Sequence, residues 1–134
     1  MNSENAYDLF MEGKKLADKN EHLKAIMLFE KASILEPLKG SIREALGLSY
    51  YNCGFYNSAK KHFKKALEID LANDFAHFCM GLCLAKEGKL AACLGHLKIA
   101  WAMKPLNTCY SKTVKKYSRL FDKFAKTQLH PEEK

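Results

Sequence analysis

The amino-acid sequence predicts an all-α fold, built of three antiparallel helix hairpins and a seventh, terminal helix. The first observation is an internal repeat, because residues 40–73 match residues 6–39 and 74–107 in register. The second is the spacing of apolar residues by three and four, which is typical of one face of a helix. The third is the short turn inside each repeat, which forces the two helices that it joins to lie antiparallel.

The repeat is carried by small and large apolar residues that recur in register. Glycine inside a helix costs about 1 kcal/mol relative to alanine, so a recurring glycine needs a compensating role. We expect the two helices of each hairpin to approach closely at the glycine and at the small residue that faces it. The recurring sets are Gly13, Gly47 and Gly81; Ala25, Ala59 and Cys93; Phe29, Phe63 and Leu97; and Ala32, Ala66 and Ala100.

A period of about 34 residues, with glycine, alanine, aromatic and proline residues at these offsets, resembles the tetratricopeptide-repeat (TPR) family over residues 6–107. Pro37 and Pro105 end the first and third repeats at the same offset, where Leu71 stands in the second. The resemblance implies a right-handed α-solenoid in which the first helix of each repeat lines the concave side.

We expect a single domain over residues 1–127, with repeats 6–39, 40–73 and 74–107 and a capping helix over 108–127. An array of repeats leaves its last apolar face open, and a terminal helix usually covers it. Thr108 is a candidate cap for this helix, as Asn73 or Asp74 is for the helix that opens the third repeat. Residues 128–134 are expected to form a disordered tail. The apolar stripe of the capping helix consists of Tyr110, Val114, Tyr117, Phe121 and Phe124.

The composition is that of a folded domain, with 48% apolar and 28% charged residues in a chain of 134. No apolar run approaches the roughly 18 residues that span a membrane. The N-terminus lacks the basic and apolar regions of a secretory signal. We therefore expect a cytoplasmic protein without membrane insertion. The five cysteines lie within helical patterns, and we expect reduced thiols that act as small apolar residues.

Three groups of residues on the first helices are not required for the hairpin core. Within each group the spacing is three and four, so its members share one helix face. Large apolar side chains left over from a core mark a docking surface when they are contiguous. We therefore expect a groove that binds a peptide segment of a partner protein. The groups are Tyr7, Phe10 and Lys14; Glu44, Leu48 and Tyr51; and Phe75, Phe78 and Leu82.

Lys112, Lys116 and Arg119 on the terminal helix are expected to add a basic end to this groove. The net charge of +7 favours acidic partners, and the expected ligand therefore has acidic and apolar side chains. Two alternatives remain open at this point. The aromatic residues could be covered by the molecule itself, or the groove could be the interface of a homodimer or larger homo-oligomer.

One TPR subtype holds the C-terminal carboxylate of chaperone tails with paired Lys and Asn residues. Where the resemblance places the first Lys and Asn, this chain has Phe10 and Lys14. Ala45 stands at the place of the next Asn. Phe78 and Leu82 stand where Lys and Arg are required. We therefore predict that the groove is not a chaperone-tail clamp.

The sequence offers little catalytic or cofactor chemistry. It has no G-x-S-x-G turn, no glycine-rich phosphate loop and no acid pair that recurs with a histidine. We therefore predict a non-enzymatic protein without a cofactor. Cys79 and Cys83 lie one helical turn apart with His77 and His96 elsewhere in the repeat, but no second cysteine pair exists, so we predict no metal site.

Lys60, Lys61, Lys64 and Lys65 form a basic band on the second helix of the second repeat. A nucleic-acid surface would need aromatic residues between these lysines. Phe63 lies between them in sequence, but it is a repeat core residue and points the other way. We therefore expect a solvated outer face and no specific nucleic-acid binding.

Overall fold

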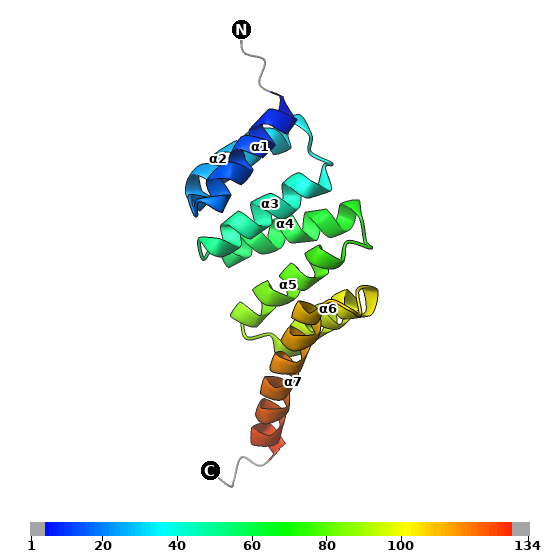
Figure 1. The fold of residues 1–134 in the computed structure, drawn as a ribbon. Coiled ribbons are helices and arrows are strands. Elements are labelled where there is room, and N and C mark those ends of the chain that lie inside the picture. Colours follow the sequence, from blue (N-terminus) through cyan, green and yellow to red (C-terminus); the bar gives the residue numbers. More distant parts are fainter. Residues whose placement is uncertain (1–4, 130–134) are drawn as a thin grey trace. The chain divides into compact units, whose positions relative to one another are not determined.

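The computed structural model describes the backbone of residues 5–129, in which all regular structure is helical (Figure 1). The predicted all-α fold class is confirmed. A helix begins at each of residues 6, 40, 74 and 108, where the three repeats and the capping helix were expected to begin. Helix α7 continues to Leu129, and residues 130–134 of the expected tail lie outside the described residues. The helices are α1 (Ala6–Asp18), α2 (His22–Leu35), α3 (Gly40–Asn52), α4 (Tyr56–Ile69), α5 (Asp74–Lys86), α6 (Leu90–Met103) and α7 (Thr108–Leu129).

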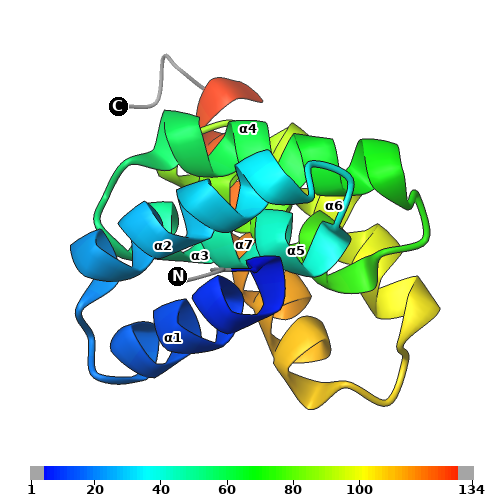
Figure 2. The same ribbon diagram turned by 90° about the horizontal axis from the view of Figure 1, so that it is seen from above.

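The chain divides into two compact units, residues 1–76 and 77–134, with the boundary inside α5. In the first unit α1 packs on α2, α3 on α4, and α2 on α3. Figure 2 shows α1 and α2 beside each other within this unit. In the second unit α6 packs on α7. The single domain expected over 1–127 remains a prediction.

The turn inside each hairpin is built in the same way. Asn20, Gly54 and Gly88 occupy the same position in successive repeats and have positive φ angles of 63°, 84° and 76°. This left-handed backbone conformation is typical of the residue that ends a helix. Glycine adopts it without steric strain, and asparagine adopts it at some cost in conformational energy. In each turn the N–H of the following residue donates to a carbonyl of the preceding helix, as from Phe55 to Tyr50 at 2.9 Å. The repeat therefore fixes the turn as well as the core.

Three helices begin with an asparagine that occupies the same position relative to the repeat period. The side-chain oxygens of Asn5, Asn73 and Asn107 accept hydrogen bonds from backbone N–H groups at 2.8, 3.0 and 3.0 Å. Of the two caps expected for α5, Asn73 is the one observed. The expectation of Thr108 as the cap of α7 is wrong, because Asn107, the preceding residue, makes that bond.

The recurring residues form the hairpin cores, as predicted. Phe63 is fully buried against Gly47, where an added Cβ would lie 2.7 Å from the ring. Gly13 meets Phe29 in the same way at 2.5 Å. In the second unit a Cβ on Gly81 would lie 2.8 Å from Leu97. The small residues opposite, Ala25, Ala59 and Cys93, are fully buried.

Helix α7 covers the second unit with the first half of its apolar stripe only. Tyr110 and Val114 are 5% and 4% exposed, whereas Phe121 and Phe124 are 39% and 60% exposed. Within the described residues no helix is both long enough and apolar enough to cross a membrane.

None of the five cysteines, all of which lie in the described part of the chain, forms a disulfide, and the environments of their thiols differ. Cys79, Cys83 and Cys93 are buried, and burial raises the pKa of Cys93 to about 11. Cys109 is exposed at the start of α7, so the expectation that it packs as a small apolar residue is wrong.

Candidate functional site

The first unit contains an open cavity of about 590 Å³ between α1 and α3, with one wall from the start of α5. A smaller hollow of about 250 Å³ shares Phe10 and Ser41 with it and reaches Tyr7 near the start of α1. The larger cavity has a mixed lining, with aromatic and aliphatic side chains beside charged and amide groups. It is lined by Phe10, Lys14, Ala17, Asp18, Asn20, His22, Phe29, Ser41, Glu44, Ala45, Leu48, Ser49, Asn52 and Phe75.

Six of the twelve predicted groove residues line these two spaces. The larger cavity brings together Phe10, Lys14, Glu44, Leu48 and Phe75. Tyr7, which is 68% exposed, lines the smaller hollow.

The other six predicted residues have different surroundings. Tyr51 is half-buried, and its ring packs edge-on against Tyr56 at 5.2 Å. Leu82 is half-buried on α5 in the second unit. The structure places the three basic residues, Lys112, Lys116 and Arg119, in exposed positions on α7.

Phe78 requires a correction. It is 8% exposed, and its ring stacks on Tyr110 of α7 with 4.7 Å between the ring centroids. The expectation that Phe78 is left over from the core is therefore wrong. Its ring is covered because α7 places an aromatic side chain directly against it.

Carboxylate groups outnumber ammonium groups in the lining of the larger cavity. The ammonium group of Lys14 lies 5.4 Å from the centre of the Phe10 ring, in a cation–π contact. The carboxylate of Glu44 accepts a hydrogen bond of 2.6 Å from the side-chain amide of Asn73. Asp18 adds a second carboxylate to the lining. This cavity therefore lacks the concentration of cations that an acidic ligand would favour.

Sequence reasoning missed several polar residues of this lining, including Asp18, His22 and Asn52. A signal for two of them was present. Asp18 and Asn52 lie one helical turn beyond Lys14 and Leu48, so the same helix-face argument extends to them. They also occupy equivalent positions of the first two repeats.

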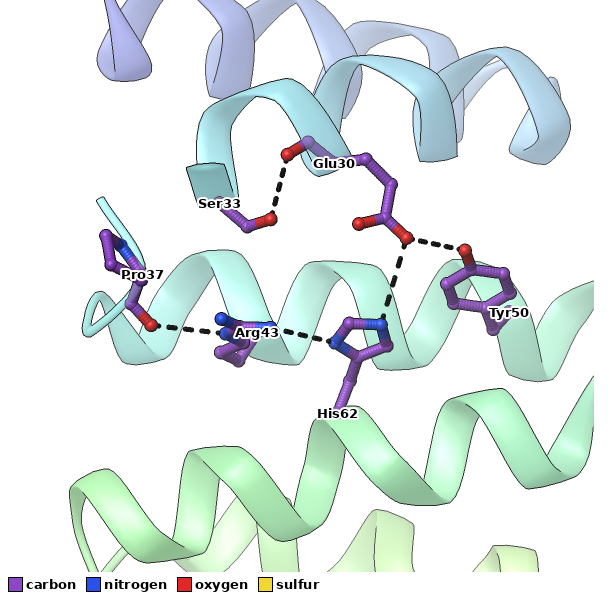
Figure 3. A network of polar contacts seen from close by, with 6 residues as sticks. All are labelled: Glu30, Ser33, Pro37, Arg43, Tyr50 and His62. Atoms are coloured by element: carbon purple, nitrogen blue, oxygen red, sulfur yellow. Dashed lines mark hydrogen bonds and ion pairs between the residues drawn. The ribbon is translucent and has the colours of Figure 1, made fainter. Parts of the chain in front are cut away.

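A separate polar cluster ties together the helices α2, α3 and α4 of the first unit (Figure 3). The hydroxyl of Tyr50 donates to Glu30 at 2.6 Å, and His62 Nε2 lies 3.9 Å from the same carboxylate oxygen. The ring of His62 stacks on Tyr50 at 5.4 Å, and its Nδ1 lies 3.4 Å from Arg43. Burial and the neighbouring Glu30 raise the pKa of Tyr50 to about 12, so the hydroxyl remains a donor.

The second unit has a histidine pair at the equivalent place. His77 and His96 stand one repeat after Arg43 and His62, and their Nδ1 atoms are 3.1 Å apart. This distance fits a hydrogen bond in which one ring donates and the other accepts. Burial lowers the pKa of His96, and the neighbouring His77 lowers it further. Burial also lowers the pKa of His62, and Arg43 adds to this while Glu30 opposes it.

We expect these shifts to make the protein less stable in acid. The unfolded chain takes up histidine protons near pH 6.5, and His62 and His96 of the native state take them up at lower pH. The free energy of unfolding should therefore be highest above about pH 6.5 and fall as the pH drops below it. Urea unfolding at pH 8.0, 6.5 and 5.5 measures this dependence.

The first repeat supplies the control variant, because Leu9 and Leu28 stand at the positions of His77 and His96. The double substitution His77→Leu/His96→Leu should reduce the loss of stability between pH 8.0 and 5.5. An equal loss in the variant and the wild type would show that this pair does not contribute.

Within the described residues, no group of three or more His, Cys, Asp or Glu side chains is arranged to hold a metal ion.

The sequence matches no family model and no curated protein. Solved structures do match. The first TPR domain of Spaghetti (RPAP3) bound to the HSP90 peptide SRMEEVD has a TM-score of 0.85 at 16% identity, covering 91% of this chain and 97% of that chain. The Sgt2 TPR domain of Aspergillus fumigatus has a TM-score of 0.85 at 15% identity, covering 90% of this chain and 82% of that chain.

The chain has the tetratricopeptide-repeat fold. A third similar structure is the Yersinia enterocolitica type III secretion chaperone SycD in complex with a peptide of the translocator YopD. Its TM-score is 0.78 at 16% identity, covering 95% of this chain and 97% of that chain. Identities this low establish the fold alone. Within the TPR fold, the cavity of the first unit lies between the first helices of the first two repeats, α1 and α3.

Proposed function

We propose that this chain is a non-enzymatic protein-interaction module and that the cavity of the first unit binds a peptide segment of a partner protein. The observation that carries the proposal is the cavity itself, of about 590 Å³, with Phe10, Leu48 and Phe75 in its lining. Ligand sites typically combine such apolar walls with a few polar groups that fix orientation. The SycD and Spaghetti structures contain bound peptides, which supports the same use of this fold here.

The chemistry of the expected ligand follows from the lining. Aromatic or aliphatic side chains of the ligand would fill the space between Phe10 and Leu48. Amide or basic groups would suit the carboxylates of Asp18 and Glu44, which outnumber the cation of Lys14. We therefore propose that the acidic ligand expected from the net charge does not use this cavity. Cysteines that form no disulfide fit a reducing compartment such as the cytoplasm, which we retain as part of the proposal.

The substitution Leu48→Asp should lower peptide affinity about tenfold, because it places a charge on an apolar wall of the cavity. Leu48 is 40% exposed, so the fold should tolerate the change. Peptides selected from a displayed peptide library on the wild-type chain would be measured against both proteins by isothermal titration calorimetry.

The matched control is Met27→Asp, which puts the same charge in the middle of α2 on a side chain that is 64% exposed and outside the cavity lining. It should leave affinity unchanged. Peptides that bind the wild type and Leu48→Asp equally would refute the site. A dimer in sedimentation that Leu48→Asp dissociates would instead assign the cavity to the homo-oligomer alternative.

We also propose that the cavity is not a carboxylate clamp, because Phe10 occupies a position where a clamp needs Lys. The peptide SRMEEVD tests this directly. Amidation of its C-terminal carboxylate should change the dissociation constant less than about threefold. A loss of tenfold or more on amidation would contradict the proposal, and its suppression by Lys14→Gln would identify the cation responsible.

A further inference from the structure

The second unit contains an apolar groove that neither the hairpin core nor the cavity of the first unit explains. It has a volume of about 540 Å³ and lies between the C-terminal half of α7 and the start of α6. Figure 1 shows this half of α7, in orange to red, running past the turn that joins α5 to α6. The α7 wall is formed by Leu120, Phe121 and Phe124, and the opposite wall includes Leu90 and Ala91.

Capping does not account for these side chains. Tyr110 and Val114 already bury the first half of α7 against its unit. Leu120, Phe121 and Phe124 remain 38%, 39% and 60% exposed. Large apolar residues on a contiguous exposed face indicate an interaction surface.

Comparison with the equivalent residues of the preceding repeats also indicates an interaction surface. The residues one repeat before Leu120 and Phe121 are Lys86 and Glu87, so the third repeat has polar residues at these places. Lys115 stands where Gly47 and Gly81 admit the second helix of their hairpins. Helix α7 is therefore not adapted to receive a second helix in the manner of a repeat. Its additional apolar residues therefore indicate a binding partner that does not pack against α7 as the second helix of a repeat does.

The charge of α7 indicates the chemistry of the molecule that binds in this groove. The helix carries six Lys or Arg residues and one Asp. Lys112, Lys116, Arg119 and Lys123 are all exposed. Helical periodicity places Lys112 and Arg119 opposite the apolar stripe, whereas Lys116 and Lys123 lie one turn before and one turn after Leu120, at one edge of the groove. A partner with acidic residues beside its apolar ones would meet both features. A second copy of this chain would instead oppose one basic edge with another, which electrostatics disfavours.

We propose that this groove docks an acidic amphipathic helix of a partner protein. The apolar anchors of that helix would lie against Phe121 and Phe124, and its Asp or Glu side chains would pair with Lys116 and Lys123. Grooves of this kind read helix residues spaced i, i+3, i+4 and i+7. The groove is recessed between two helices, which suits a row of side chains better than the flat surface of a membrane.

The test uses the full chain and two synthetic peptides of about 14 residues, which form ~20 Å of helix. Both carry leucine on one helical face, and the flanking positions are Glu in one peptide and Lys in the other. Fluorescence anisotropy should show the Glu peptide binding at least about tenfold more tightly at low salt. Phe124→Asp should weaken this binding about tenfold, and Lys116→Glu/Lys123→Glu should remove the preference for Glu over Lys.

Two matched controls keep the result specific. Leu106→Asp alters a side chain of the same unit that is 93% exposed and outside the groove, and it should bind the Glu peptide as the wild type does. Leu48→Asp, in the cavity of the first unit, should also leave this binding unchanged. Loss of Glu-peptide binding in either control would overturn the assignment to the α6–α7 groove.

Other occupants give distinct results, each of which overturns the proposal. Equal binding of the two peptides, with sedimentation onto phosphatidylserine vesicles that Phe124→Asp abolishes, would assign the surface to a membrane. A dimer that Phe124→Asp dissociates would assign it to a second copy. A tenfold gain in Glu-peptide affinity on deletion of residues 130–134 would assign it to the chain's own last residues.

Discussion

Replacing Gly47 by Leu is expected to destabilise the first unit by about 3 kcal/mol, the upper part of the usual range for an overpacked core. A Cβ at this position would lie 2.7 Å from the ring of Phe63, closer than real Cβ atoms approach other atoms. The ring is fully buried and cannot turn away without displacing its neighbours. Either α3 and α4 separate or the ring leaves its preferred rotamer, and both outcomes lose packing.

Urea unfolding followed by far-UV circular dichroism measures the effect, with Gly95→Ala as the control. Gly95 also lies inside a helix, but an added Cβ there meets no atom within 4 Å. Its replacement should raise stability by about 1 kcal/mol through helix propensity alone. If Gly47→Leu proved as stable as the wild type, the close approach of the two helices would not be what retains this glycine.

The features that recur in every repeat could be predicted from the sequence because each has a local physical cause. Gly54 and Gly88 adopt the left-handed conformation expected of a helix end. Phe63 fills the space that Gly47 leaves open, as the repeat predicts. These residues meet partners within their own hairpin, and the period identifies both members of each pair.

The groove was harder to predict because its exposure depends on side chains from the next repeat. Glu44 and Phe78 are equivalent in the repeat, yet Glu44 lines an open cavity and Phe78 is buried. The residue that decides this for Phe78 is Tyr110, whose ring stacks on it. The equivalent of Tyr110 one repeat earlier is Ala76, which has no ring to place over Glu44. The period alone treats the two positions as alike.

The N-terminal cap of α7 was predicted incorrectly for a different reason. Asn5, Asn73 and Asn107 share the period, but the second repeat has Lys39 at this place, and α3 begins without a side-chain cap. A threonine directly after Asn107 gave an equally acceptable cap by residue type. Only the backbone geometry, in which the N–H of Tyr110 points to Asn107, separates the two.

Phe78→Ala is expected to destabilise the second unit by about 3 kcal/mol, as buried Phe-to-Ala substitutions generally do. The substitution removes a ring that is 8% exposed and leaves Tyr110 without its stacking partner. Because Tyr110 belongs to α7, the loss should loosen the contact between α7 and the rest of this unit. Hydrogen exchange should accordingly speed up at the amides of α7 as well as in α5.

Leu48→Ala is the comparison that separates a core role from a ligand-binding role, since Leu48 is 40% exposed and lines the cavity of the first unit. Leu48→Ala should lower the free energy of unfolding by less than about 1 kcal/mol, as substitutions outside a core usually do. Phe78→Ala should lower the free energy of unfolding and leave the peptide affinity of the first unit unchanged. If Phe78→Ala instead weakened peptide binding and left urea unfolding unaltered, Phe78 would belong to the ligand surface, and the stacking on Tyr110 would not hold α7 in place.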